Sequence, residues 1–297
     1  DWSSDVCSSD LITPTVQSYA RWHFGCSTLK GAYLDKEGDH WDPQLFAGDF
    51  MTIPIPIEPA YTGLSLALLQ DSGWYMANFD RAESLAHGAE LGCDFAEGDC
   101  SVDSRGPFFC DGKKSSGQYF CGPTLRTIGV CMTSKGQCPT VRTLKSEGNV
   151  DCRVSSPVLS PKESEDRAEE WGTLDSRCFL STVNKLVPGV KPIHEAPSGG
   201  CYRHHCQNGM LHVKLGTEYK LCPSAGGVMP FTSVEGHVGN VLCPPAASLC
   251  RPGFQFGVAG YDEAVLEGKG IKTNSILKHS GDFSSDDEFT DIDSGFV

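Results

Sequence analysis

The sequence predicts an α+β protein with few helices in its first third, followed by a disulfide-rich part that is mostly β or irregular. Apolar residues recur at helical spacing only in the first third of the chain. Fourteen of the fifteen cysteines lie between Cys26 and Cys250, and they are dense after Cys93. Gly (33) and Pro (18) exceed average usage, which favours turns over long regular helices.

A chain of 297 residues is long enough for two modest domains with separate cores. We predict that residues 12–99 form the first and residues 100–255, which carry most of the cysteines, form the second. Residues 1–11 are Ser/Asp-rich and patternless, and we interpret them as an artefactual leader. Residues 256–297 are acidic with little apolar material to bury, which predicts a disordered tail.

Two helices are expected in the first part. Thr13 and Pro14 suit the N-cap and first position of a helix that ends at Gly25-Cys26. From Thr62 to Ser72 the leucines predict a mostly buried helix, with Thr62 as its cap and Gly73 at its end.

The remaining segments are shorter. Ile53–Ile57 has two prolines and predicts an extended connector. The alternation in Leu211–Leu215 predicts a strand with one apolar face. Residues 160–170 are highly charged, which predicts a surface loop or a short exposed helix. We expect three aromatic residues after the second helix to lie in the core: Trp74, Tyr75 and Phe79.

The net charge of −14 argues against nucleic acid as a partner, because an acidic surface repels phosphates. No apolar run approaches the ~18 residues that a membrane-spanning helix requires. The mean hydropathy of −0.24 is typical of a soluble globular protein.

Fifteen cysteines indicate an oxidising compartment, in which disulfides persist. Structural zinc is the alternative, but it requires paired short Cys-x2-Cys spacings, and none occurs. The nearest candidate is Cys201-Tyr-Arg-His-His-Cys206, and we interpret its two histidines, His204 and His205, as ordinary surface residues.

Four stretches occur in an order that is typical of one protein family. They are Thr13-Pro-Thr-Val with Phe24-Gly-Cys26, then His40-Trp with Asp49-Phe-Met51, then Leu64-Ser-Leu-Ala-Leu-Leu-Gln-Asp-Ser-Gly-Trp-Tyr75, and finally Leu242-Cys-Pro-Pro245. Over residues 12–252 the chain resembles leishmanolysin, a zinc metallopeptidase of trypanosomatids whose relatives occur widely in eukaryotes.

The resemblance implies a metzincin-type site that holds one zinc ion. Two ligands come from a His-Glu-x-x-His helix, whose Glu is the general base, and a third histidine follows after a long insertion. On this basis His40 is the third ligand and Met51 is the methionine of the turn beneath the metal. Three protein ligands leave a fourth position open for the water that attacks a peptide carbonyl.

The chain departs from the family pattern because it contains no His-Glu-x-x-His. Its only His-Glu pair, His194-Glu195, is followed by Ala-Pro-Ser, and proline would spoil the required helix. We therefore expect a C-terminal fragment of a zinc metalloendopeptidase, with the motif encoded upstream of Ile12. One imidazole cannot hold a catalytic zinc, so we expect no catalytic residue and no activity in this fragment.

The family's cysteine order implies seven disulfides, which spacing alone could not choose among the alternatives. The implied pairs are Cys26–Cys93, Cys100–Cys138, Cys110–Cys131, Cys121–Cys178, Cys152–Cys201, Cys206–Cys250 and Cys222–Cys243.

As a peptidase, the parent protein would act on proteins or peptides outside the cell or at its surface. Membrane association is only a family expectation. The alternative is a non-catalytic, cysteine-rich adhesion or binding module derived from such a peptidase. A generic disulfide scaffold without a metal site is a third possibility. Substrate preference cannot be predicted from this sequence.

Overall fold

A computed structural model describes these residues: 10–53, 55, 59–98, 108, 110, 118–132, 138–143, 150–154, 161–186, 196–232 and 236–254. Residues 1–259 form one compact unit, and residues 260–297 form a second unit, which lies outside the described residues. The predicted tail, the predicted boundary at residues 99 and 100, and most of the Ile53–Ile57 connector also lie outside them.

The described elements are few helices and many strands, and the predicted α+β class is confirmed. The helices are α1 (Pro14–Phe24), α2 (Gly63–Asp71), α3 (Gly92–Glu97), α5 (Pro161–Asp166) and α6 (Ala247–Cys250), with a 3-10 turn η1 (Phe79–Arg81). A small ladder joins β1 (Asp10–Leu11) to β2 (Ala32–Tyr33), so the last residues of the predicted leader form a strand. No described helix is both long and apolar enough to cross a membrane.

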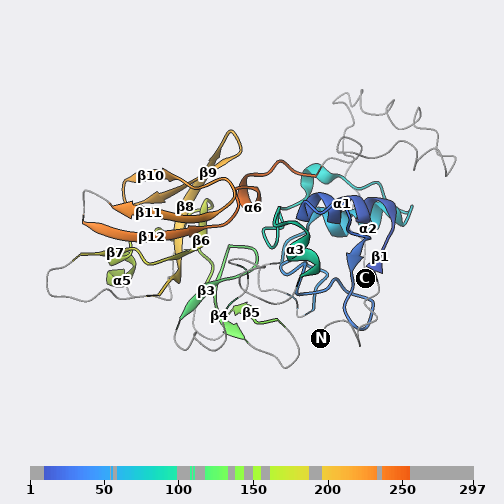
Figure 1. The fold of residues 1–297 in the computed structure, drawn as a ribbon, viewed down its shortest axis with the longest axis horizontal. Helices are drawn as coiled ribbons and strands as arrows, with labels where there is room; N and C mark the ends of the chain where they lie inside the picture. Colours follow the sequence, from blue (N-terminus) through green and yellow to red (C-terminus); the bar gives the residue numbers. More distant parts are fainter. Residues whose placement is uncertain are drawn as a thin grey trace, which may run out of the picture. The chain divides into compact units, whose positions relative to one another are not determined.

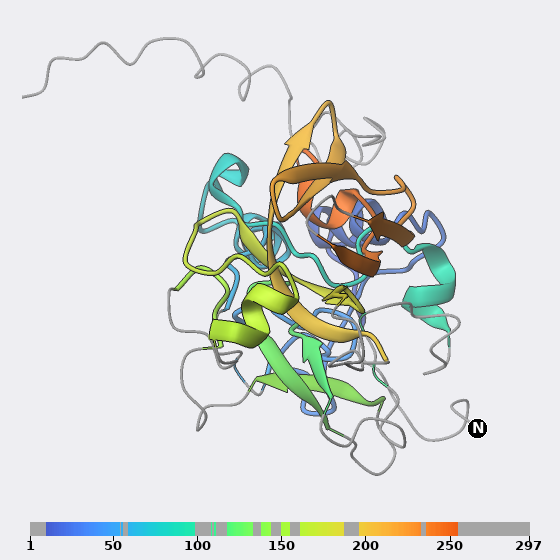
Figure 2. The ribbon, with the colours of Figure 1, turned by 90° about the vertical axis from the view of Figure 1, so that its left-hand side faces the viewer.

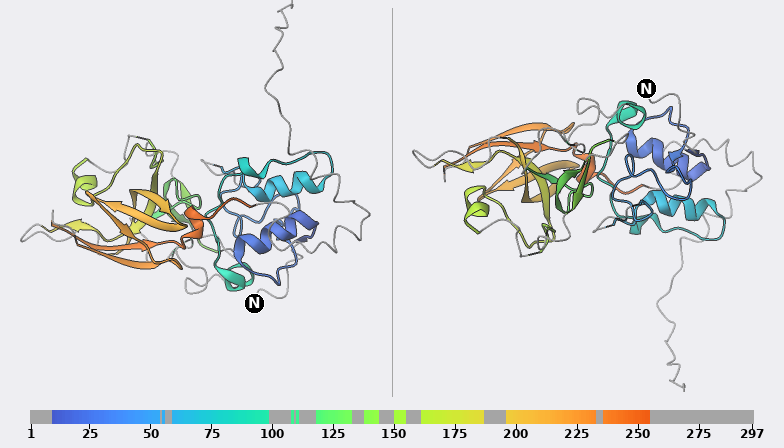
Figure 3. Two further views of the ribbon diagram at one scale, coloured as in Figure 1. Left: turned by 90° about the horizontal axis from the view of Figure 1, so that it is seen from above. Right: turned by 90° about the horizontal axis from the view of Figure 1, so that it is seen from below.

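Helix α1 begins after Thr13 and ends at Gly25, whose φ of 69° permits the left-handed turn. The Thr13 side chain, however, makes no capping hydrogen bond. Asp71 at the end of α2 caps the helix instead. Its Oδ2 accepts the backbone N–H groups of Thr15 (2.8 Å) and Val16 (3.0 Å). Figure 3 shows α1 and α2 side by side.

Helix α2 is only half buried, which corrects the prediction of a mostly buried helix. Leu64 is fully buried, whereas Leu69 is 37% exposed. Beyond it, Gly73 (φ 73°) turns the chain outward. Trp74 is 85% exposed and Tyr75 is 57% exposed, so placing them in the core was wrong; Phe79, at 7% exposed, does lie there.

The exposure of Trp74 leads to a test on stability. Replacing Trp74 by serine should change the free energy of unfolding by less than about 0.5 kcal/mol, because the ring buries little surface on folding. Urea denaturation followed by circular dichroism measures this. A loss above about 2 kcal/mol would show that the ring is packed.

A seven-stranded antiparallel sheet forms the main β layer (Figure 1), in the order β10-β9-β8-β6-β12-β11 with β7 on β12. Its strands are β6 (Ser176–Ser181), β7 (Asn184–Lys185), β8 (Ser198–Gln207), β9 (Met210–Leu215), β10 (Glu218–Leu221), β11 (Gly227–Thr232) and β12 (His237–Cys243). The long curved strand β8 (Figure 2) pairs with β6 through its first six residues and with β9 through its last four.

The predicted strand at residues 211–215 is confirmed as part of β9, and Leu211, Val213 and Leu215 are fully buried. A second sheet contains β3 (Tyr119–Cys121), β4 (Ile128–Met132) and β5 (Thr140–Thr143), with β4 in the centre.

The charged segment 160–170 is only partly at the surface. Helix α5 exposes Lys162 and Glu165, but Arg167 just after it is fully buried. Its guanidinium lies 2.7 Å from the Glu169 carboxylate and donates to the carbonyl of Ser198 (3.0 Å). A buried charge is tolerated when it is paired in this way. The charge pattern of residues 160–170 could not predict that Arg167 would be buried with Glu169 as its partner.

Six disulfides are described, and they join the same cysteines that the family order implied. They are Cys26–Cys93, Cys110–Cys131, Cys121–Cys178, Cys152–Cys201, Cys206–Cys250 and Cys222–Cys243. Cys100 of the seventh pair lies outside the described residues. Each bridge contributes roughly 2–4 kcal/mol, and together they fit an oxidising compartment.

Candidate metal centre

His40 lies at the end of a tight loop that is built around the carboxylate of Asp35. Asp35 Oδ1 accepts the backbone N–H groups of Gly38 (2.9 Å), Asp39 (3.3 Å) and His40 (3.4 Å). The Asp35 N–H in turn donates to the His40 carbonyl at 2.9 Å. Because both ends of the loop are bonded to one residue, the position of His40 is fixed relative to Asp35.

The imidazole of His40 is oriented by two carboxylates. Its Nδ1 lies 2.7 Å from Asp39 Oδ1 and 3.2 Å from Asp35 Oδ2. The His40 side chain is 31% exposed, and among the described residues its Nε2 has no hydrogen-bond partner. The ring therefore offers one nitrogen that is free to bind a metal ion.

The carboxylate of Asp35 is held in its charged form. Burial raises its pKa, but the N–H groups of Gly38, His40 and Asp39 and the nearby His40 ring outweigh burial, so the pKa lies below its usual value. An ionised Asp35 can accept the Nδ1–H of His40 throughout the neutral range.

Met51 lies in a second turn, next to this loop. The residue after His40, Trp41, donates its N–H to the Met51 carbonyl at 3.1 Å. Asp49 Oδ1 accepts the Met51 N–H at 2.8 Å, and Met51 packs against the core cluster. The two segments that the resemblance singled out are thus hydrogen-bonded neighbours.

A buried polar network fastens both segments to α2. Asp49 is completely buried and accepts the hydroxyls of Ser65 (2.7 Å) and Thr62. Ser65 Oγ in turn accepts the indole N–H of buried Trp41 at 3.0 Å. Burial raises the pKa of Asp49, and the bonds from Thr62, Met51 and Ser65 offset part of the rise. Helix α2 therefore positions the loops of His40 and Met51.

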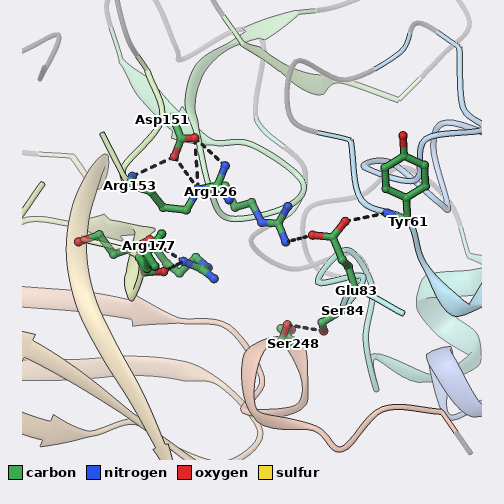
Figure 4. A network of polar contacts seen from close by, with 10 residues as sticks. Tyr61, Glu83, Ser84, Arg126, Asp151, Arg153, Arg177 and Ser248 are labelled. Atoms are coloured by element: carbon green, nitrogen blue, oxygen red, sulfur yellow. Dashed lines mark hydrogen bonds and ion pairs between the residues drawn. The ribbon is translucent and has the colours of Figure 1, made fainter. Parts of the chain in front are cut away.

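Glu83, downstream of α2, joins the segment before α2 to the strands (Figure 4). Its carboxylate accepts the Tyr61 N–H at 2.9 Å and pairs with Arg126 at 2.6 Å. Asp151 and Arg153 form a second ion pair beside it at 2.7 Å. Arg177 completes the group, and burial together with Arg126 and Arg153 lowers its pKa to about 10. We interpret this network as structural, because both of its carboxylates are paired with arginines and Arg177 donates to the backbone carbonyls of Leu174 and Ser176.

Sequence reasoning singled out His40 and Met51 but missed Asp35 and Asp39. Ligand atoms of Asp35, Asp39 and His40 lie within 4.8 Å of one another. The second described group of this kind is Cys26, Cys93 and Glu97, but its cysteines share a disulfide and are not free to bind a metal. The spacing Asp35-x-x-x-Asp39-His40 was a visible signal, although acidic residues in a glycine-containing loop are common.

Comparison with known proteins finds that the chain is similar to peptidases. The family model described as leishmanolysin matches residues 3–140. The "Leishmanolysin-like peptidase" of Caenorhabditis briggsae is 28% identical over 303 residues, covering 81% of this chain. The protein of the same name from Drosophila melanogaster is 25% identical, covering 84%. The "Ciliated left-right organizer metallopeptidase" of Danio rerio is 29% identical, covering 82%.

The chain spans less than half the length of these relatives. The aligned share is 45% of the Caenorhabditis briggsae and Drosophila melanogaster proteins and 40% of the Danio rerio protein.

Proposed function

We propose that this chain, which is similar to leishmanolysin and to leishmanolysin-like peptidases, supplies the third zinc ligand, His40, and the turn methionine, Met51, of a zinc metalloendopeptidase. The parent protein would hydrolyse peptide bonds in proteins or peptides. This piece lacks the His-Glu-x-x-His motif and would be inactive alone.

The observation that supports the proposal is that the two nitrogens of His40 have different surroundings: Nδ1 faces two carboxylates, whereas Nε2 has no described hydrogen-bond partner. Histidines that bind metals almost always donate their other ring N–H to a carboxylate or a carbonyl, which fixes the tautomer and the orientation of the ring. With Nδ1 2.7 Å from Asp39 and 3.2 Å from Asp35, His40 has this arrangement. Its Nε2 would be the ligand atom.

The residues present fit one part of a zinc site. Zinc in a catalytic site takes three protein ligands and an open position, and when bound it supplies Lewis acidity at the scissile carbonyl. The described loop offers one imidazole with two outer carboxylates. In the proposed assembly the remaining two imidazoles come from a His-Glu-x-x-His helix in the rest of the parent protein.

The chain's own residues would hold the ligand still. Asp35 would keep the proton on Nδ1 of His40 and leave Nε2 unprotonated. Asp49 would hold the Met51 turn against Trp41, the neighbour of His40. An imidazole that is already oriented loses less conformational freedom when it binds a metal ion. Asp35 and Asp49 would therefore support metal affinity without touching the ion.

Protein or peptide substrates and an extracellular or cell-surface location follow from the same proposal, and the disulfides support the location. The net charge of −14 supports the absence of nucleic acid among its partners.

The proposal is tested first by the transcript upstream of Ile12, which should encode His-Glu-x-x-His. In the parent protein, His40→Ala should then abolish stoichiometric zinc and peptidase activity. Asp35→Asn combined with Asp39→Asn should weaken zinc binding by about 10- to 100-fold, because both carboxylate partners of Nδ1 are then replaced by neutral amides. Zinc is measured by mass spectrometry after dialysis against graded chelator.

Glu37→Ala is the matched control, since Glu37 is exposed in the same loop; it should retain full zinc and activity. A transcript without the two upstream histidines would favour the alternative, a cysteine-rich adhesion module. Full zinc occupancy in His40→Ala would contradict the role of His40.

A further inference from the structure

The outer face of the β8-β9-β10 sheet carries a pair of histidines that the peptidase function does not use. Leu211, Val213 and Leu215 of β9 point into the core, so the residues between them, His212 and Lys214, point outward. His205 of β8 is directly opposite His212 in the antiparallel ladder. The two imidazoles therefore stand on the same face.

The two rings lie against each other. Their centroids are 4.7 Å apart and their planes differ by only 2°. Tyr219 of β10 lies edge-on to His205, with 4.5 Å between centroids and an angle of 69°. Both histidines are half-buried, so part of each side chain is exposed to solvent.

Neither ring is used for a described hydrogen bond. Nδ1 of His212 is shielded from solvent and has no partner among the described residues. The neighbouring His204 differs, because its Nδ1 lies 2.5 Å from the Asp175 carbonyl. A shielded nitrogen without a partner is costly, and a metal ion is one partner that would satisfy it.

We propose that His205 and His212 form a surface site for a divalent transition-metal ion that prefers imidazole, such as Cu²⁺, Ni²⁺ or Zn²⁺. Opposite positions of an antiparallel pair place Cβ atoms about 5 Å apart, within the span of two imidazoles that share one ion. The site belongs to β8 and β9, and it involves neither His40 nor a cysteine.

Binding requires a small rearrangement. A metal–nitrogen bond of about 2.0–2.1 Å lies in the plane of the imidazole, whereas the planes of the two stacked rings are parallel. Each ring must turn about χ2 so that the two lone pairs converge, and this torsion is broad for histidine. The ion would thus replace ring stacking with coordination, and water would complete its shell.

The experiment is a Cu²⁺ titration of the oxidised chain at pH 7.5, followed by electron paramagnetic resonance. The unmodified chain should show a copper signal with two nitrogen ligands from this site. His205→Gln and His212→Gln should each remove that signal and weaken binding at least about tenfold, which is about 1.4 kcal/mol.

The matched controls are His204→Gln, next to the site, and His40→Gln, in the other candidate centre. Both should retain the two-nitrogen signal. Unchanged unfolding curves without metal would show that the variants fold, as expected for half-buried positions. Copper binding unaltered by His205→Gln and His212→Gln, or lost only in His40→Gln, would overturn the proposal.

Discussion

Replacing Asp49 by alanine is expected to lower the free energy of unfolding by about 3–5 kcal/mol, because two buried donors and one half-buried donor lose their common acceptor. These are the Met51 N–H and the hydroxyls of Ser65 and Thr62, and Asp49 itself is completely buried. The shortened side chain also leaves space beneath the turn. Chemical denaturation of the oxidised chain measures the loss.

Asp49→Asn separates hydrogen bonding from charge. The amide keeps one oxygen for the Ser65 hydroxyl and the Met51 N–H, and its nitrogen can donate to the Thr62 hydroxyl after that group reorients. We expect a smaller loss of about 1–2 kcal/mol. If alanine and asparagine were equally mild, below about 1 kcal/mol, the network would not hold the Met51 turn to α2.

Acidification from pH 6.5 to pH 5 should cost about 2 kcal/mol of stability through His23 alone. This ring is 2% exposed, and its Nε2 lies 2.8 Å from the His87 carbonyl. Burial, the largest cause, lowers the pKa of His23 to about 3. The unfolded chain gains a proton near pH 6.5, whereas the folded chain does not, so stability falls as the pH falls from about 6.5 to 3.

His23→Gln removes this proton and keeps a donor for the His87 carbonyl. The slope of unfolding free energy against pH between 6 and 5 should then decrease by up to about 1.4 kcal/mol per pH unit. Urea denaturation at half-unit steps gives both curves. Parallel curves for the variant and the unmodified chain would show that His23 takes up a proton in the folded state.

Local sequence patterns correctly predicted those elements that are determined by residues close together in the sequence. Thr13, Gly25 and the alternation at Leu211–Leu215 act through their own backbone or their own face. The N-terminal bond of α1 could not be predicted, because Asp71 reaches it from 55 residues away. The prediction that Trp74 is buried was wrong for the same reason. The apolar ring of Trp74 suggested a place in the core, but the turn at Gly73 determines where the side chain points.

Parts of the candidate metal centre were accessible from sequence only through family resemblance. His40 and Met51 are single residues without periodicity, and their hydrogen-bonded proximity depends on Trp41 and Asp49. The role of Asp35 could not be predicted, because it depends on three backbone N–H groups that converge only after the loop closes. The pairing of His205 with His212 required the register of β8 and β9, which sequence spacing leaves open.

The last described segment returns to the first helix, and this affects how the protein is made. Arg251 lies 3.7 Å over the ring of Trp22 and donates to its carbonyl at 2.7 Å, a separation of 229 residues. Phe254 packs on Tyr19 and Trp22. A nascent chain elongating at roughly 5–20 residues per second would leave these aromatic rings uncovered for about 10–50 seconds. Chaperones that bind the nascent chain therefore have a defined apolar target on the emerging polypeptide.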